Sequence, residues 1–460
     1  MKRSKKLCIL LGVLIAACLA ALAAMYAEEK KEEIKTSGET VLSVESAKVT
    51  ALCWEQDGMT LSFRRGDDGW QYDDDAEFPV SDSAMDALLE PFRSLSAAFT
   101  IENAEDLGRY GLDEPTCTIT LTTADQTYTV KLGNYSTMDS QRYVDIGDGN
   151  VYLAASDPMD AYDVELKDLI ANDAVPNFDE VSQLQFSGSA DYTAVYDEDG
   201  TSLCDDDTYF TSDGKPLDTD QVSNYISNLR YLDLTDYVTY KVTDEELASY
   251  GLDDPELTVS VDYTDDGTSD TFVLHISRDP EELKSAADAD TDDNEDSSDI
   301  TAYARVGASK IVYKLSGSRY KALMAAGYDD LRHQEIFTGD FDEVTGLDIT
   351  LDGETYTLTS QKDGKERTWL CEEAEIEIGD LQDALEALTA EEFTSEKASG
   401  QQEISLTLHL DHEDEPELTI ALYRCDGSKC LVVVDGKSVA YVPRSEMVTL
   451  AEAVRTIALS

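Results

Sequence analysis

Two copies of one short motif constrain this chain more than any other feature. The motif Tyr-Gly-Leu-Asp-acidic-Pro stands at residues 110–115 and again at 250–255. Its glycine follows a tyrosine at a place where a left-handed backbone, which suits a residue without Cβ, ends a helix. The proline then prevents the helix from continuing and keeps the residue before it extended. The motif therefore predicts a helix end that leads into a strand, twice in the chain.

The defining residues of the motif are Tyr110, Gly111, Leu112, Asp113 and Pro115 in the first copy and Tyr250, Gly251, Leu252, Asp253 and Pro255 in the second. In the second copy Thr243 and Glu246 have the spacing of a capping box, which predicts a short helix from Thr243 to Tyr250. Leu247 and Leu252 are spaced for the apolar contact of a Schellman ending. We interpret the motif as structural; a ligand site built on its two aspartates is the alternative.

The elements around the motif recur in the same order, which predicts tandem repeats. Each unit has opening strands, a helix, further strands joined by hairpin turns, and a closing helix. Because hairpins join most strands, the sheets should be mainly antiparallel, and the fold class is α+β. The predicted units are residues 47–176, 177–334 and 335–460, of which the third lacks the motif. The predicted helices outside the motif are 81–96, 158–170, 219–232, 318–326, 379–388 and 445–457.

The N-terminus carries the clearest signal for location. Lys2, Arg3, Lys5 and Lys6 precede an uncharged run from Leu7 to Ala27, which is long enough to cross a bilayer as one transmembrane helix. The basic cluster should stay cytoplasmic, so the rest of the chain should lie outside the cell membrane. Two alternatives are cleavage near Ala21-Leu22-Ala23 and lipid attachment at Cys18. Residues 28–46 read as a tether between the anchor and the first unit.

The charge of the chain excludes one class of partner. With 97 acidic and 35 basic residues the net charge is −62, which repels nucleic-acid phosphates and argues against DNA or RNA binding. Residues 279–299 form an acidic insertion in the second unit, a composition typical of a disordered, solvated loop. Asp288, Asp290 and Asp292 offer alternate oxygen ligands for calcium. An EF-hand loop needs Gly at its sixth position and Glu at its twelfth, where this run has Asp293 and Asp299.

Cysteines and histidines suggest no metal, cofactor or catalytic centre. Only Cys425 and Cys430 are close in sequence; they flank a predicted hairpin turn and are either a disulfide or two free thiols. A zinc site would need a second close pair. The four histidines are not spaced as helical metal ligands, and there is no phosphate-binding glycine loop or Gly-x-Ser-x-Gly elbow. We therefore do not expect an enzyme.

The repeated motif, the tryptophans of the opening strands, Gly133 after a strand and the single N-terminal span together resemble a bacterial family, domain of unknown function 4340. The resemblance covers most of residues 47–330 in two copies, and the third unit is a degenerate match. It implies an envelope-anchored protein that accompanies ABC-type export systems of the gliding-motility auxiliary kind. It implies no catalytic residues.

These observations lead to one expectation and one alternative. We expect a single-span, extracytoplasmic interaction protein that is an accessory of an ABC transporter, with a permease or ATPase subunit as partner. The transporter follows from the resemblance alone, whereas the topology and the repeats follow from the residues. The alternative is an envelope module that binds cell-wall glycan, peptide or calcium. An apolar patch on the membrane-proximal unit favours the first, and exposed aromatics clustered on one face favour the second.

Overall fold

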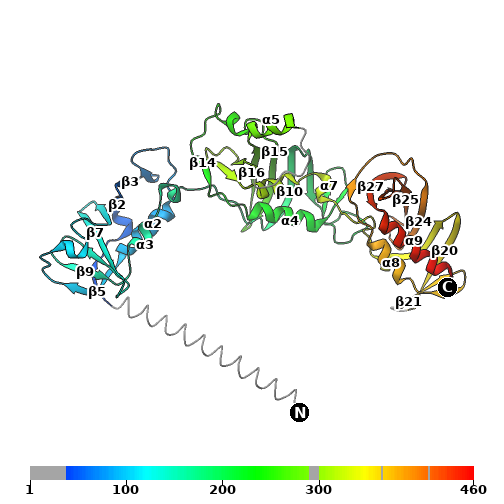
Figure 1. The fold of residues 1–460 in the computed structure, drawn as a ribbon, viewed down its shortest axis with the longest axis horizontal. Helices are drawn as coiled ribbons and strands as arrows, with labels where there is room; N and C mark the ends of the chain where they lie inside the picture. The colour runs from blue at the N-terminus through cyan, green and yellow to red at the C-terminus, as the bar shows by residue number, and fades with distance from the viewer. Residues whose placement is uncertain (1–37, 290–299, 364–365, 413–414, 460) are drawn as a thin grey trace, which may run out of the picture. The chain divides into compact units, whose positions relative to one another are not determined.

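The computed structural model describes residues 38–459 except 290–299, 364–365 and 413–414 (Figure 1). The described chain forms two compact parts, one ending at Asp173 and one beginning at Ala174. The first part holds one nine-stranded sheet and the second part holds two. The pairings are antiparallel and helices accompany each sheet, so the fold is α+β with mainly antiparallel sheets. No described helix has the length and apolar character to span a bilayer, and the predicted span Leu7–Ala27 lies outside the described residues.

The first sheet has the order β1-β5-β9-β8-β7-β6-β2-β3-β4. Its strands are β1 (Glu39–Leu42), β2 (Val49–Gln56), β3 (Met59–Gly66), β4 (Gly69–Tyr72), β5 (Leu95–Ile101), β6 (Cys117–Thr123), β7 (Thr127–Ser136), β8 (Gln141–Asp145) and β9 (Val151–Ala154). Its helices are α2 (Asp82–Arg93) and α3 (Met159–Tyr162), with 3-10 turns η1 (Ser46–Lys48), η2 (Leu107–Tyr110) and η3 (Leu166–Leu169).

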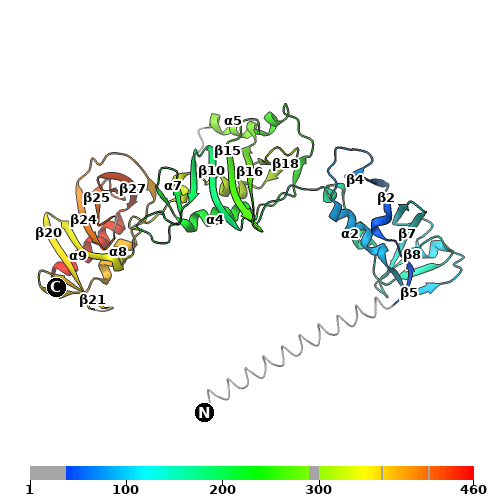
Figure 2. The same cartoon turned by 180° about the vertical axis from the view of Figure 1, so that it is seen from behind.

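The second sheet has the order β13-β12-β11-β10-β15-β16-β17-β18-β14. Its strands are β10 (Glu180–Gly188), β11 (Tyr192–Tyr196), β12 (Tyr209–Thr211), β13 (Pro216–Leu217), β14 (Tyr237–Thr239), β15 (Leu257–Asp265), β16 (Thr268–Arg278), β17 (Ala302–Val306) and β18 (Val312–Leu315). Its helices are α4 (Thr219–Arg230), α5 (Pro280–Ala289), α6 (Gly317–Met324) and α7 (Tyr328–Leu331), with the 3-10 turn η4 (Leu247–Tyr250). Figure 2 shows α4 and α5 apart, with β10, β15 and β16 between them.

The third sheet has the order β22-β21-β20-β19-β24-β25-β26-β27-β23. Its strands are β19 (Val344–Leu351), β20 (Glu354–Asp363), β21 (Glu366–Cys371), β22 (Ala374–Ile376), β23 (Glu392–Phe393), β24 (Gln402–Leu410), β25 (Glu417–Arg424), β26 (Lys429–Val434) and β27 (Lys437–Pro443). Its helices are α8 (Gly379–Glu386) and α9 (Arg444–Leu459), with the 3-10 turn η6 (Phe341–Glu343).

The three sheets repeat one topology. In each sheet the first strand after the long helix pairs with the last strand, and the opening strand of the unit pairs with the strand that follows the motif position. Each of these central pairings has a bulge near its start, and there a hydroxyl donates to the facing strand's carbonyl. The three bonds are Thr50 Oγ1 to Thr122 O at 3.2 Å, Ser182 Oγ to Asp262 O at 3.2 Å, and Thr345 Oγ1 to His409 O at 3.0 Å. The three units therefore share individual hydrogen bonds as well as the order of their strands.

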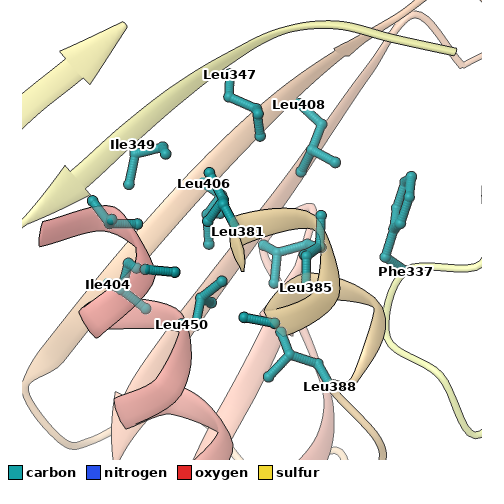
Figure 3. Close-up of a cluster of buried hydrophobic side chains, with 14 of the residues drawn as sticks. Phe337, Leu347, Ile349, Leu381, Leu385, Leu388, Ile404, Leu406, Leu408 and Leu450 are labelled. Carbon is teal, nitrogen blue, oxygen red and sulfur yellow. The ribbon is translucent and has the colours of Figure 1, made fainter. Parts of the chain in front are cut away.

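Helices cover one face of each sheet because their apolar residues recur at helical spacing. In the third sheet Leu381 and Leu385 of α8 and Leu450 of α9 are fully buried against strand residues such as Leu406 (Figure 3). Each such leucine contributes about 1.5–3 kcal/mol when it leaves water.

Two predicted helices end earlier than expected. The helix expected over 158–170 is interrupted, because α3 ends at Tyr162 and the turn η3 begins only at Leu166. Between them the backbone N–H of Glu165 donates to Asp168 Oδ2 at 2.8 Å, which caps η3 and separates it from α3. The helix expected to reach Ser96 ends at Arg93, since Ser94 leaves helical geometry, with φ of −158° and ψ of 73°, and β5 starts at Leu95.

Two regions predicted to be irregular contain regular structure. The tether expected over 28–46 includes β1, which pairs with β5 at the sheet edge. The insertion expected to be disordered over 279–299 begins with α5, because Asp279 Oδ1 accepts from the backbone N–H of Glu281 at 2.9 Å and Pro280 suits the first helical turn. The calcium candidates Asp290 and Asp292 lie outside the described residues, and Asp288 lies within α5.

Candidate functional site

The motif forms a tight helix ending in both copies. Gly111 and Gly251 have φ of 70° and 68°, in the left-handed region. The N–H of Leu112 donates to Leu107 O at 3.1 Å and that of Leu252 to Leu247 O at 3.0 Å, which is the Schellman pattern. The helix expected from Thr243 is shorter, because only the turn η4 forms.

The motif packs against the middle of its sheet and leaves no room for larger residues. A Cβ on Gly251 would lie 2.5 Å from Ser277 Oγ, and one on Gly133 would lie 2.2 Å from Tyr110 O. Asp113 accepts a hydrogen bond from the backbone N–H of Glu114 at 3.0 Å, so its side chain stabilises the turn to which it belongs. The motif therefore packs on the sheet face that the helices do not cover, at one end of the central strands.

Each motif tyrosine lies against a second tyrosine on a strand. The Tyr110 and Tyr143 ring centroids are 5.0 Å apart, and those of Tyr250 and Tyr303 are 5.1 Å apart. In the first sheet the register continues this contact across the strands, because Tyr143 pairs with Leu153, and Leu153 pairs with Phe99. We call the row that runs from the rings of Tyr110 and Tyr143 through the aliphatic Leu153 to the ring of Phe99 the aromatic row. Phe99 at its end is 63% exposed.

A cluster of metal-ligating side chains lies where the second sheet is followed by the third. His333 follows α7, and its Nε2 is 2.9 Å from Asp207 Oδ1 and 3.1 Å from Asp207 Oδ2. Cys204 belongs to the same loop as Asp207, and its sulfur completes a group whose ligand atoms lie within 4.8 Å of one another. Asp207 is held from its other side by the hydroxyl of Ser202, 2.6 Å from Oδ2.

The second nitrogen of His333 faces two further carboxylates. Nδ1 is 3.8 Å from Asp218 Oδ2 and 3.9 Å from Glu335 Oε2. Burial lowers the pKa of His333, but the hydrogen bond and charge of Asp207 outweigh burial, so the pKa is raised above its usual value. Burial raises the pKa of the Cys204 thiol. Sequence reasoning missed this cluster because His333 is remote in the chain from the other residues.

The third sheet has a polar cavity of about 570 Å³ between the β19–β20 turn, the start of β24 and α9. Arg455 forms an ion pair with Asp352 at its mouth, at 2.8 Å. Inside, Arg444 Nη2 lies 3.5 Å from Glu403 Oε1. Arg444 Nε and Glu403 Oε2 are buried without a hydrogen-bond partner among the described residues. Both residues line the cavity with side chains that are 30% and 18% exposed, so a guanidinium donor and a carboxylate acceptor are available there to a polar ligand.

The two cysteines of the predicted pair have different surroundings. Both are free thiols in the structure: Cys430 is buried among the residues under α9, while Cys425 is exposed in the turn. The Cys425 thiol donates to Tyr423 O at 3.8 Å.

Comparison with known proteins gives a family. The model of the family described as Domain of unknown function (DUF4340) matches residues 70–203 and 209–407, which together exceed half of the chain. The second match reaches into β24 of the third sheet. No curated protein and no solved structure matches the chain. With two matched copies, the chain belongs to the family of the domain of unknown function DUF4340.

Proposed function

We propose that this chain is a membrane-anchored, extracytoplasmic interaction protein that serves as an accessory of an ABC-type transport system. The observation that carries the proposal is the concentration of exposed apolar side chains on the first sheet. Exposed large apolar residues that are clustered near a membrane anchor are typical of protein–protein contact. Those on this side of the first sheet are Phe99 of β5, Tyr135 of β7 and Met138 in the β7–β8 turn, which are 63%, 44% and 90% exposed.

The predicted anchor keeps the first sheet close to a membrane partner. Eleven residues separate Ala27 from Glu39, where β1 begins. Fully extended, they reach roughly 40 Å at most. With a tether of this length, the first sheet can contact only those extracytoplasmic loops or domains of a membrane protein that lie within this distance of the bilayer. The aromatic row then presents Phe99 to a partner whose contact surface is apolar, and the net charge of −62 favours basic residues around it.

Affinity purification of the full-length protein from native membranes tests this proposal. We expect a permease or ATPase subunit of an ABC transporter to copurify at near-stoichiometric levels, as measured by mass spectrometry. Phe99→Ser should reduce this recovery several-fold, because a buried aromatic anchor often supplies more than about 2 kcal/mol of binding.

Met59→Ser is the matched control, since Met59 is equally exposed in the same sheet but lies in the β2–β3 hairpin. It should leave recovery unchanged. Copurification of no membrane protein would contradict the proposed transporter partner. Equal recovery for Phe99→Ser and the wild type would contradict the proposed role of Phe99 in the contact.

A ligand-binding module is the second candidate function, and the cavity of the third sheet favours it. The Arg444 guanidinium and the Glu403 carboxylate, which line this cavity, could pair with a carboxylate and an amine or hydroxyl of a cell-wall peptide. Titration of the full-length protein with wall peptide and glycan fragments tests this candidate by calorimetry. Binding that Arg444→Gln abolishes, while Arg64→Gln on the first sheet does not, supports it; absence of heat with both ligand classes removes it.

A further inference from the structure

We propose that Cys204, Asp207 and His333 bind a zinc ion, independently of the transporter partner. The three side chains supply one sulfur, one oxygen and one nitrogen ligand, and these atoms lie within 4.8 Å of one another. Zinc accepts this combination in sites with three protein ligands and one open position. In the described part of the chain, each group of metal-ligating residues contains His333.

The separation of two of the three ligand atoms is close to that expected in a tetrahedral zinc site. Zinc lies about 2.3 Å from sulfur and about 2.0–2.2 Å from nitrogen or oxygen, so neighbouring ligand atoms are separated by roughly 3.3–3.6 Å. His333 Nε2 and Asp207 Oδ1 are now 2.9 Å apart, in a direct hydrogen bond. Opening this contact by a few tenths of an ångström places both atoms at ligand separation. The hydrogen bond is thus the metal-free form of the same arrangement.

Polar groups lie beside two of the proposed ligands, on the sides where zinc sites place the groups that orient their ligands. A ligating histidine usually donates its other N–H to a carboxylate, which fixes its tautomer. His333 Nδ1 has Asp218 and Glu335 within 4 Å on that side. Ser202 plays the same part for Asp207, because its hydroxyl donates to Oδ2 and leaves Oδ1 for the metal. Ser202 is therefore a positioning residue.

Burial and charge favour a divalent ion of intermediate softness. The Asp207 side chain is 1% exposed, and a buried carboxylate is stabilised by a cation bound to it. A thiolate is a poor ligand for calcium or magnesium, whereas zinc binds sulfur, nitrogen and oxygen. On binding, the thiol proton of Cys204 and any proton on His333 Nε2 pass to solvent.

The site also joins two parts of the fold. Leu203, between Ser202 and Cys204, packs against the core of the third sheet. Arg332, next to His333, lies with its guanidinium 4.1 Å from the centre of the Phe393 ring. A zinc ion there would fasten the 202–207 loop to the segment that leads into the third sheet, so metal binding should raise the melting temperature of this region.

Cobalt titration of the full-length protein in mild detergent, after removal of metal by a chelator, tests the proposal. We expect one equivalent of Co²⁺ to produce a thiolate-to-metal charge-transfer absorption band that Zn²⁺ abolishes by competition. Cys204→Ser should remove the band and His333→Asn should prevent saturation. Ser202→Ala should weaken zinc affinity by about 10- to 100-fold while keeping the band.

Cys425→Ser is the control, because Cys425 is an exposed thiol outside the cluster. It should keep the full band, and circular dichroism should show each variant folded. A wild-type protein without the band at saturating Co²⁺ leaves only a hydrogen-bonded His–Asp pair and overturns the proposal. A band that survives Cys204→Ser but disappears in Cys425→Ser overturns it as well.

Discussion

The motif glycines hold a backbone conformation that other residues adopt at a cost. A left-handed residue with a Cβ is disfavoured by about 1–2 kcal/mol. Gly251 has in addition a neighbour in the way, since its Cβ would meet Ser277 Oγ at 2.5 Å. Gly267, in the β15–β16 turn, has φ of 76° but nothing within 4 Å of a Cβ. Comparing substitutions at these two positions therefore distinguishes the cost of backbone strain from the cost of a steric collision.

Substitution of these glycines by alanine should therefore have unequal effects. We expect Gly267→Ala to lower the free energy of unfolding by about 1 kcal/mol. Gly251→Ala should lower it by at least about 1 kcal/mol more, because the Cβ forces the motif away from β16. Urea unfolding followed by circular dichroism measures both. Equal losses would show that the motif does not pack closely on its strand.

His275 gives a prediction for acid stability. Burial lowers its pKa below 6.5, and the charge of Arg305 lowers it further. Protonation is thus easier in the unfolded chain, so the stability that neutral His275 contributes is present above pH 6.5 and is lost as the pH falls through the lower folded pKa. Between about pH 7 and pH 5 we expect His275→Gln to lose less stability than the wild type. His412→Gln is the control and should follow the wild type.

Single residues also show what the sequence leaves open. Cys204 and Asp207 are three positions apart, but His333 joins them only through the fold, so no local pattern could predict their meeting. Another signal was present and overlooked. Phe-Asp-Glu-Val-Ser at 178–182 and Phe-Asp-Glu-Val-Thr at 341–345 precede equivalent bulges of the second and third sheets, so they mark the third repeat directly.

At the scale of elements, alternation and helical spacing predicted most strands and long helices, because those patterns depend on burial of one face. β6 and β24 alternate buried and less buried residues along their length, as a sheet with one covered face requires. Elements without such a pattern were missed. β5 begins directly after α2 and carries a bulge, and β1 is a short edge strand that the pairing with β5 holds in place.

The helices over the third sheet give a prediction for an element. Leu385 of α8 is fully buried, whereas Asp383 on the same helix is exposed. We expect Leu385→Ala to reduce the free energy of unfolding by about 2–5 kcal/mol, because it leaves a cavity under the sheet. Asp383→Ala should change it by less than about 0.5 kcal/mol. Hydrogen exchange should place the loss in α8 and β24; a loss spread over the first sheet would contradict the assignment.

At the scale of the whole molecule, three copies of one strand order account for the length of the chain. The sequence predicted the repeated order since each unit preserves its hydrophobic pattern, and the motif marks two of the copies. It did not predict which surfaces are free, because exposure depends on which strands become neighbours. Phe99 is exposed at the end of a row of residues from three strands and the motif turn, a surface that exists only after folding.

The orientation across the membrane can be tested with a natural label. Cys425 is an exposed thiol, and the other described cysteines are buried or half-buried. If the chain beyond the predicted span is extracytoplasmic, a membrane-impermeant maleimide should label intact cells with a permeable wall. Cys425→Ser should remove most of the label. Labelling that appears only after lysis would place this part of the chain in the cytoplasm.

Site-specific crosslinking tests whether the first sheet binds a membrane partner through the aromatic row. A photoreactive amino acid replaces Phe99 in one variant and Met59 in another, and both are irradiated in living cells. We predict a crosslink from position 99 to a subunit of an ABC transporter and little from position 59. Absence of a crosslink at 99, or equal crosslinks at both positions, would contradict the account.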